Sequence, residues 1–143
     1  TAYDCGIDAA IVSDIGCIAL IKRTVPNLEI HVPTPAGVVN YVTANELYQM
    51  GAKRVVLARE VDIENIKRIR DNIPEDMDIE VFVHGAMCVS FSGRCLLSAF
   101  MTGRNANKGE CAQPCRWKYH LVEEKRPGDY YELSEGDGGS MLS

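Results

Sequence analysis

The sequence predicts an α/β protein in which parallel strands alternate with helices, followed by a cysteine-rich loop and a β-hairpin. Apolar runs typical of strands start near residues 9, 28, 54 and 79, about one βα unit apart. Apolar residues at helical spacing fill the intervals between these runs. After residue 87 the alternation stops and cysteines accumulate. The chain therefore has a βα part and a separate cysteine-bearing part.

The predicted βα part consists of four short strands and three amphipathic helices. Pro26, Gly51 and Pro74 stop the helices, and Asp62 is the expected N-cap of the third. The abundance of Val and Ile predicts strands that are buried on both faces. In chain order the elements are a strand at 9–14, a helix at 15–25, a strand at 28–32, a helix at 38–50, a strand at 54–58, a helix at 63–69 and a strand at 79–83.

Two architectures fit this order, a doubly wound sheet and part of a TIM-type (β/α)8 barrel. A whole barrel takes roughly 200–250 residues, so 143 residues can hold about half of one. In either architecture the carboxyl ends of the strands carry the chemistry. The residue pairs at these predicted ends are Ser13/Asp14, His31/Thr34, Arg59/Glu60 and His84/Gly85.

Three segments are expected along the chain: βα repeats at 1–87, a cysteine-rich segment at 88–120, and a hairpin with a flexible tail at 121–143. Residues 99–108 read as a loop. Residues 117–123 and 130–133 read as strands joined by the turn-forming run 125–129. The tail contains little to bury and is expected to be a loop or the scar of a truncation.

Composition excludes several classes of protein. A hydrophobic content of 46% and a net charge of −5 are typical of a globular chain, which argues against intrinsic disorder. No apolar run is long enough to predict a membrane helix, and the first residues do not resemble a signal peptide. The missing initial Met suggests that the chain begins inside something larger. The expected location is the cytoplasm, with no membrane partner.

The cysteines fall into two groups. Cys5 and Cys17 lie in an apolar stretch and are expected to be buried small hydrophobic residues. Cys88, Cys95, Cys111 and Cys115 crowd together, and in a reducing compartment such clusters are metal-binding or catalytic more often than disulfide-bonded. Their long, irregular spacing favours an iron–sulfur cluster over zinc, which usually shows paired short spacings. Structural zinc and unligated thiols remain the alternatives.

Charge in the cysteine-rich segment reverses the average of the chain. Residues 88–120 hold five basic residues against one acid, a net charge of +4. Such a patch stabilises thiolates, binds a carboxylate or phosphate, or is simply a solvated loop. Trp117 and Tyr119 alternate with Arg116 and Lys118, which suits an ordinary strand better than base stacking.

Histidines mark two predicted strand ends. His84 lies four residues before Cys88, and His31 holds the equivalent place two strands earlier. Proton transfer or substrate binding is one interpretation of these residues, and a structural role is the other. Glu80 is expected to start the last strand of the repeats, at the end opposite His84. No GxSxG, HExxH, Walker or GxGxxG element supports a standard hydrolase or nucleotide-binding site.

One run of the sequence carries a specific resemblance. Residues 80–98, EVFVHGAMCVSFSGRCLLS, closely resemble the signature of the collagenase-like peptidase family, also called peptidase family U32. GRNANKG at 103–109 and CAQPCR at 111–116 are also similar to the family. The matching signature positions are Glu80, Phe82, Gly85, Ala86, Met87, Cys88, Gly93, Cys95, Leu97 and Ser98.

The resemblance implies a barrel-type α/β domain and an oxygen-sensitive [4Fe–4S] cluster held by the four clustered cysteines. It implies two possible activities: a collagenase-like peptidase, or oxygen-independent hydroxylation of tRNA, ribosomal RNA or ubiquinone rings with prephenate as oxygen donor. Ser92 and Ser98 lack an evident His or Asp partner, which ranks the peptidase lower. In some members the fourth cluster ligand lies farther downstream, which makes Cys115 the least firm of the four.

The sequence hypothesis is therefore an iron–sulfur RNA hydroxylase acting on tRNA or rRNA. His84, Arg94 and Arg116 are the candidate contacts for the donor or the substrate, because cationic and hydrogen-bonding side chains recognise carboxylates. A collagenase-like peptidase is the first alternative. A zinc-stapled, non-catalytic binding module is the second.

Overall fold

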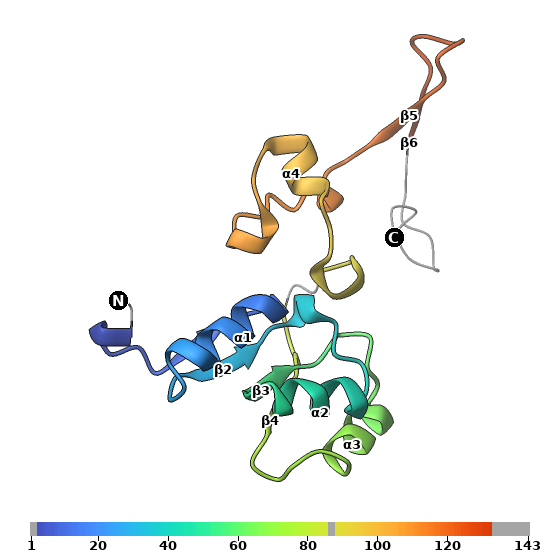
Figure 1. Ribbon diagram of the computed structural model, residues 1–143. Helices are drawn as coiled ribbons and strands as arrows, with labels where there is room; N and C mark the ends of the chain where they lie inside the picture. Colours follow the sequence, from blue (N-terminus) through green and yellow to red (C-terminus); the bar gives the residue numbers. More distant parts are fainter. Residues whose placement is uncertain (1–2, 86–87, 133–143) are drawn as a thin grey trace. The chain divides into compact units, whose positions relative to one another are not determined.

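The computed structural model describes residues 3–85 and 88–132 (Figure 1). The chain divides into two compact units. The first comprises Thr1–Met87 and Phe91–Gly93, and the second Cys88–Ser90 and Arg94–Ser143. A short piece of chain at 91–93 thus belongs to the βα unit although cysteine-bearing residues of the other unit flank it.

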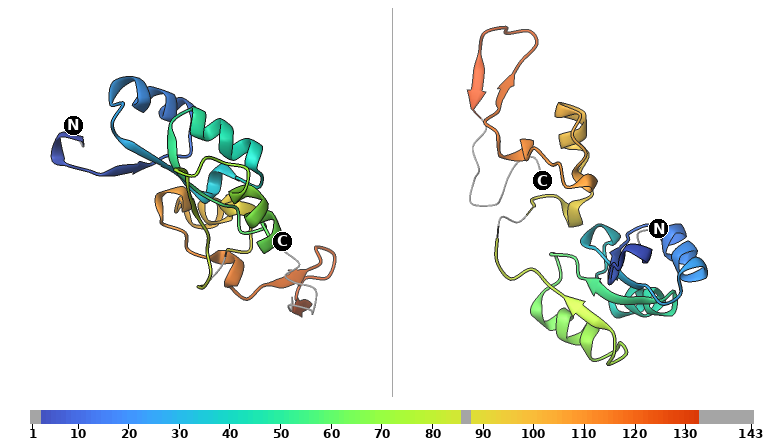
Figure 2. Two further views of the ribbon diagram at one scale, coloured as in Figure 1. Left: turned by 90° about the horizontal axis from the view of Figure 1, so that it is seen from below. Right: turned by 90° about the vertical axis from the view of Figure 1, so that its left-hand side faces the viewer.

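The first unit is built on a four-stranded sheet, shown from two further sides in Figure 2. All neighbouring strands are parallel, and their spatial order is their chain order, β1-β2-β3-β4. This confirms the predicted alternation. The order lacks the reversal that defines a doubly wound sheet. The elements are β1 (Ala9–Ile11), α1 (Ile15–Thr24), β2 (Glu29–Val32), α2 (Tyr41–Gln49), β3 (Ala52–Val56), α3 (Ile63–Arg70) and β4 (Asp78–Glu80).

The core lies around the two inner strands. Fully or almost fully buried apolar side chains come from β2, β3, the loops after them, the helices and the turn before β4: Ile18, Ile30, Val32, Val38, Val55, Leu57, Ile69 and Met77. The outer strands differ. Ile11 of β1 is 76% exposed, and β4 contains no buried residue. The prediction of burial on both faces is therefore wrong for β1 and β4, each of which pairs with one strand among the described residues.

Capping side chains fix where the helices begin. The carboxylate of Asp62 accepts a hydrogen bond from the Asn65 amide at 2.7 Å, which confirms the predicted N-cap. The second helix begins later than predicted because the side chain of Asn40 caps it. Val38 instead forms an extended bridge to Leu57 and is buried.

Gly51 ends the second helix, as predicted, for two physical reasons. Its φ is +99°, a conformation that costs residues with a side chain about 1–2 kcal/mol. A β-carbon there would lie 2.3 Å from Cε of Lys22. The glycine therefore lets the chain turn from α2 into β3 while the stem of Lys22 packs over it.

A polar cluster at Asp76 joins the turn before β4 to α2 and β3. The Tyr48 hydroxyl donates to its carboxylate at 2.9 Å, and Lys53 donates to Oδ2 at 3.2 Å and to the main-chain carbonyl. The hydrogen bond from Tyr48, then that from Lys53, hold the pKa of the Asp76 carboxyl below its ordinary value. Tyr48 in turn has a raised pKa, because its phenol donates to a carboxylate.

The lowered pKa of Asp76 predicts an acid-dependent loss of stability. A carboxyl with a depressed folded-state pKa stabilises the fold above its unfolded pKa of roughly 4 and loses this contribution as pH falls further. In the full-length protein, Asp76→Asn should lower the melting temperature at pH 7, and the difference from wild type should shrink below about pH 4. Asp8→Asn, an exposed control, should show no such trend. A pH-independent difference would contradict the expectation.

The second unit holds short elements. They are α4 (Leu97–Thr102), two single 3-10 turns, η4 (Ala106–Lys108) and η5 (Pro114–Arg116), and an antiparallel hairpin of β5 (His120–Val122) and β6 (Tyr130–Glu132). The hairpin is confirmed within narrower bounds. The prediction of a loop at 99–108 is wrong for its first residues, because α4 continues to Thr102 and ends at a left-handed cap, Gly103. The predicted tail at 135–143 lies outside the described residues.

Within the described part of the chain, no helix has the length and apolar character needed to cross a membrane.

Candidate functional site

All four cysteines of the predicted metal site belong to the second unit. None forms a disulfide. Cys88 and Cys111 are exposed, and Cys95 and Cys115 are half-buried. Cys95 lies just before α4, and Cys115 lies inside η5. Short helical elements therefore interrupt the predicted loop, one of them containing Cys115 and another beginning just after Cys95.

Two of these sulfurs accept backbone hydrogen bonds of the same type. The Leu97 amide donates to Sγ of Cys95 at 3.3 Å, and the Gln113 amide donates to Sγ of Cys111, also at 3.3 Å. In both cases the donor lies two residues after the cysteine. The two amides are therefore oriented toward sulfurs of the predicted metal site. Backbone amides on sulfur are also one of the means by which proteins adjust the potentials of iron–sulfur clusters.

Cys115 lies within electrostatic range of the other three thiols. Burial raises the pKa of Cys115, electrostatic interactions with Cys88, Cys111 and Cys95 raise it further, and Arg116 lowers it. Among residues 3–85 and 88–132, no three His, Cys, Asp or Glu side chains lie close enough to share one metal ion. A tetranuclear cluster is larger than a single zinc ion, whose ligands all lie about 2.0–2.3 Å from one point.

Three hydrogen bonds hold the segments that carry these thiols. The Ala112 amide donates to Oγ of the buried Ser98 at 3.0 Å, which ties the chain beside Cys111 to α4. Thr102 donates to the Ser98 carbonyl at 2.6 Å. The Tyr119 hydroxyl donates to the Pro114 carbonyl at 2.7 Å, next to Cys115. The signature serine Ser98 therefore has a structural role here.

The predicted contact residues are divided between the units. Arg94 and Arg116 are exposed and belong to the unit of the cysteines. His84 is exposed and belongs to the βα unit, four residues beyond the end of β4. The structure thus places both arginines, but not the histidine, in the unit that contains the thiols.

Sequence reasoning missed the contact between Glu60 and Ser92. The Ser92 amide donates to Oε1 of Glu60 at 2.8 Å, and its hydroxyl donates to Oε2 at 2.7 Å. Burial alone would raise the pKa of Glu60, but the two hydrogen bonds from Ser92 outweigh it and lower that pKa. The position of Glu60 at a strand end was a usable signal, whereas nothing in the sequence pointed to its partner.

Backbone strain also marks the cysteine-bearing stretch. Among the described residues, two non-glycine residues have positive φ: Ser92 at 42° and Gln113 at 53°. Ser92 stands between Cys88 and Cys95, and Gln113 between Cys111 and Cys115. Such conformations cost on the order of 1–3 kcal/mol and cluster at functional sites.

Other strand-end residues have structural roles. Asp14 caps α1 by accepting from the Cys17 amide at 2.8 Å, and His31 lies 3.4 Å from the carboxylate of Glu29. The prediction that Glu80 starts the fourth strand is wrong, because β4 ends there. The strand begins earlier, at Asp78, which is the register partner of Arg54 and pairs with its guanidinium at 3.0 Å.

The prediction that Cys5 and Cys17 are buried is also wrong, since both are exposed. Cys5 lies in η1 (Tyr3–Cys5), which buries no residue. Cys17 lies on α1, whose buried residue is its neighbour Ile18. Adjacent residues on a helix point in directions about 100° apart, so the side of α1 that covers the core leaves Cys17 outside.

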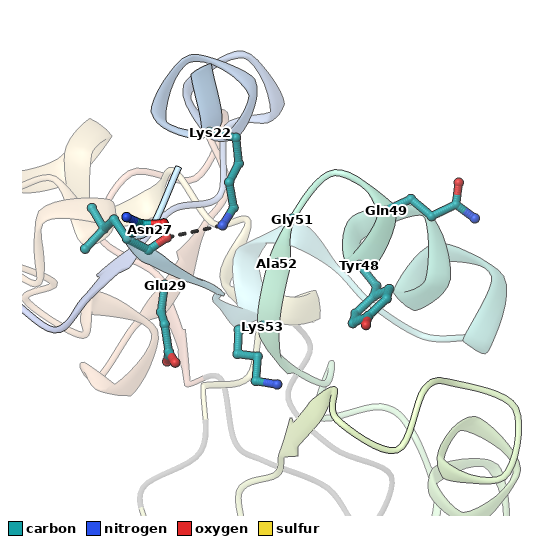
Figure 3. A pocket seen from close by; sticks show the side chains of 9 residues that line it. Lys22, Asn27, Glu29, Tyr48, Gln49, Gly51, Ala52 and Lys53 are labelled. Atoms are coloured by element: carbon teal, nitrogen blue, oxygen red, sulfur yellow. Dashed lines mark hydrogen bonds between the residues drawn. The ribbon is translucent and has the colours of Figure 1, made fainter. Parts of the chain in front are cut away.

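A pocket of about 410 Å³ lies at the amino ends of β2 and β3 (Figure 3). The ammonium group of Lys22 donates to the carbonyls of Pro26 and Leu28, each at 3.3 Å, so its charge is already engaged. Ligands of α/β folds bind at the carboxyl ends of the strands, the opposite edge. The pocket is lined by Lys22, Asn27, Leu28, Glu29, Tyr48, Gln49, Gly51, Ala52 and Lys53, none of them a predicted site residue.

The fold and the thiols together define a class: an α/β protein of sequential parallel βα units joined to a unit with four clustered free cysteines. The sequence profile of peptidase family U32 matches residues 1–143. The chain belongs to this family. The solved structure of the U32 peptidase Mk0906 is similar in fold, with a TM-score of 0.51 and 21% identity, and the match covers 62% of this chain and 35% of that one.

Curated relatives carry names of both activities. The chain is 47% identical over 120 residues to tRNA hydroxylation protein P of Escherichia coli, covering 84% of the chain and 26% of that protein. It is 39% identical to the 23S rRNA 5-hydroxycytidine C2501 synthase of E. coli, covering 86% and 18%. It is 35% identical to a collagenase of Porphyromonas gingivalis, covering 85% and 31%. The chain thus spans about a quarter of the length of the first of these relatives.

Proposed function

We propose that this chain is the cluster-binding part of an iron–sulfur-dependent, oxygen-independent RNA hydroxylase whose sheet continues into a (β/α)8 barrel. The observation that carries the proposal is the set of four free cysteines in one unit, with two of the sulfurs receiving backbone hydrogen bonds. The relatives named for tRNA hydroxylation and for rRNA hydroxycytidine synthesis support RNA as the substrate. The unreversed strand order supports the barrel.

Cys88, Cys95, Cys111 and Cys115 would hold a [4Fe–4S] cluster. The donor set fits the group, because four cysteines are the usual ligands of such clusters and the amides of Leu97 and Gln113 donate to two of the sulfurs. When bound, the cluster supplies an iron site beside which an oxygen-bearing co-substrate can be positioned. The side chains of the protein would then recognise the oxygen donor and the RNA.

Arginine side chains are the proposed contacts for the oxygen donor. Prephenate carries two carboxylates, and a planar guanidinium binds a carboxylate through two parallel hydrogen bonds. Arg94 and Arg116 are exposed and belong to the unit of the thiols, so both can take this role. His84 is proposed as a further contact or proton carrier. The net charge of +4 between residues 88 and 120 also attracts the phosphates of RNA.

The peptidase alternative is supported by the relative named collagenase but weakened by the two signature-region serines. Ser92 is 0% exposed and Ser98 is 1% exposed, so a substrate carbonyl cannot approach either hydroxyl. Ser92 donates its hydroxyl to Glu60, and Ser98 accepts from a backbone amide. A nucleophilic serine needs both an adjacent base and access to the scissile bond.

Anaerobic purification of the full-length protein tests the proposed function. It should yield about four irons and four sulfides per chain and absorb broadly near 400 nm, as iron–sulfur proteins do. Nucleoside mass spectrometry should detect hydroxylated uridine or cytidine in RNA treated with this protein and prephenate without oxygen. An iron-free full-length protein would refute the proposal. One zinc per chain would favour the binding module, and gelatin cleavage that survives loss of Cys88 and Cys95 would favour the peptidase.

The role of Arg94 predicts a binding defect. Arg94→Ala in the full-length enzyme should raise the KM for prephenate roughly 10- to 100-fold, the effect of losing a charge-assisted hydrogen-bonding group. Its melting temperature and iron content should stay unchanged. Arg104→Ala, another exposed arginine of the same unit, is the matched control. An unchanged KM in the Arg94 variant would show that Arg94 does not hold the donor.

A further inference from the structure

Both carboxylate oxygens of Glu60 accept hydrogen bonds from one residue of a distant segment, Ser92. Glu60 follows β3, and its carboxylate accepts from the Ser92 amide at 2.8 Å and from the Ser92 hydroxyl at 2.7 Å. Ser92 is 0% exposed. Hydrogen bonds to a charged acceptor are about twice as strong as neutral ones, so this pair is a strong local anchor.

A second contact holds the same segment. Ser92 lies in η3 (Phe91–Gly93), and η3 packs against η2 (Thr34–Ala36), the turn that follows β2 (Figure 1). The segments following two adjacent parallel strands therefore both hold η3. This explains why residues 91–93 belong to the βα unit although residues on either side do not.

The anchored residue adopts an unfavourable backbone conformation. Ser92 has φ 42° and ψ 34°, inside a turn whose other residues are helical. Serine visits the left-handed region rarely, and strain of this kind persists only where the surroundings enforce it. Here the enforcing contact is Glu60, because one carboxylate binds the amide and the hydroxyl of the same residue.

We propose that Glu60 is a positioning residue for the thiols of Cys88 and Cys95. Ser92 lies four residues after Cys88 and three before Cys95. When Glu60 holds Ser92 in place, only a short segment of chain connects this fixed residue to each thiol. Short connecting segments lose little conformational entropy when the thiols bind a common group, and preorganisation of this kind strengthens binding. The inference rests on the proposed function for the identity of that group, the iron–sulfur cluster.

Glu60→Gln in the full-length protein tests this role. The amide keeps the shape of the side chain but replaces one acceptor oxygen by a donor group, which cannot receive a hydrogen bond from Ser92. Backbone amides at 91–93 should exchange hydrogen about tenfold faster, as expected when a charge-assisted hydrogen bond is lost. Iron should leave to a chelator several-fold faster under anaerobic conditions. Glu75→Gln, at an exposed glutamate before β4, is the matched control and should change neither rate.

Ser92→Gly gives a second, independent variant. It removes the hydroxyl donor but tolerates the left-handed backbone, so it should accelerate exchange and iron loss even if Glu60→Gln fails to fold. Exchange at 91–93 equal to that of the Glu75 variant would overturn the anchor. Faster exchange with unchanged iron release would overturn the positioning role. If the wild-type protein contains no iron, the proposed function fails, and alkylation tests the inference instead. The alkylation rates of Cys88 and Cys95 are then measured relative to that of the exposed Cys17, in wild type and in Glu60→Gln. Equal relative rates in the two proteins would overturn the positioning role.

Discussion

If the proposed iron–sulfur cluster is present, replacing Cys88 with serine should remove it from the full-length protein. A serine hydroxyl is a far weaker ligand for iron than a thiolate, and Cys88 contributes to the electrostatic field at Cys115 together with the other two thiols. We expect the iron content to fall below about one per chain and the broad absorption near 400 nm to disappear. Metal and sulfide analysis after anaerobic purification measures both.

Cys17→Ser is the matched control for this loss. Cys17 is an exposed free thiol on α1, in the βα unit, and its replacement should leave the iron content unchanged. Cys115→Ser extends the test to the ligand that the resemblance to the family made least firm. Loss of iron in this variant would assign Cys115 as the fourth ligand, whereas full retention would assign that place to another residue. Full retention of iron in Cys88→Ser would refute the cluster site.

Ile30→Ala should cause a large loss of stability in the βα unit. Ile30 is 0% exposed on β2, an inner strand, and packs in the main apolar core. Removing a buried aliphatic side chain of this size costs about 2–5 kcal/mol, because apolar burial is lost and a cavity remains. Denaturant-induced unfolding of the full-length protein, followed by a probe of the βα unit, measures the change.

Ile63→Ala makes the same chemical change at the surface. Ile63 begins α3 and is 84% exposed, so its replacement should alter the free energy of unfolding by less than about 0.5 kcal/mol. Equal effects of the two substitutions would contradict the assignment of the core. A large effect confined to Ile30 would support it.

The βα repeats could be predicted because their signals are local. Asp62 caps its helix and Gly51 ends another, as residue chemistry requires, and strands recur at the spacing of βα units. The errors arise where tertiary contacts override local pattern. Val38 fits a helical spacing but is extended against Leu57, and Asp78 is drawn into β4 by its pairing with Arg54.

The candidate site was only partly accessible from sequence. The clustering of the cysteines and the charge reversal around them are visible in the chain itself. Hydrogen bonds from the amides of Leu97 and Gln113 to sulfur depend on local backbone geometry that no periodicity encodes. The partnership of Glu60 and Ser92 spans 32 residues, so neither spacing nor motif could reveal it.

The separation of Glu60 and Ser92 by 32 residues also determines the order in which parts of the protein fold. The acceptor on Glu60 is in place only after β3 has paired within the sheet, and contacts between residues distant in sequence form late because their loops must close first. During synthesis the four strands of the sheet emerge before the four clustered cysteines at 88–115. Assembly of the sheet thus precedes the arrangement of Cys88 and Cys95, and under the proposed function a defect in the early strands should lower the iron content.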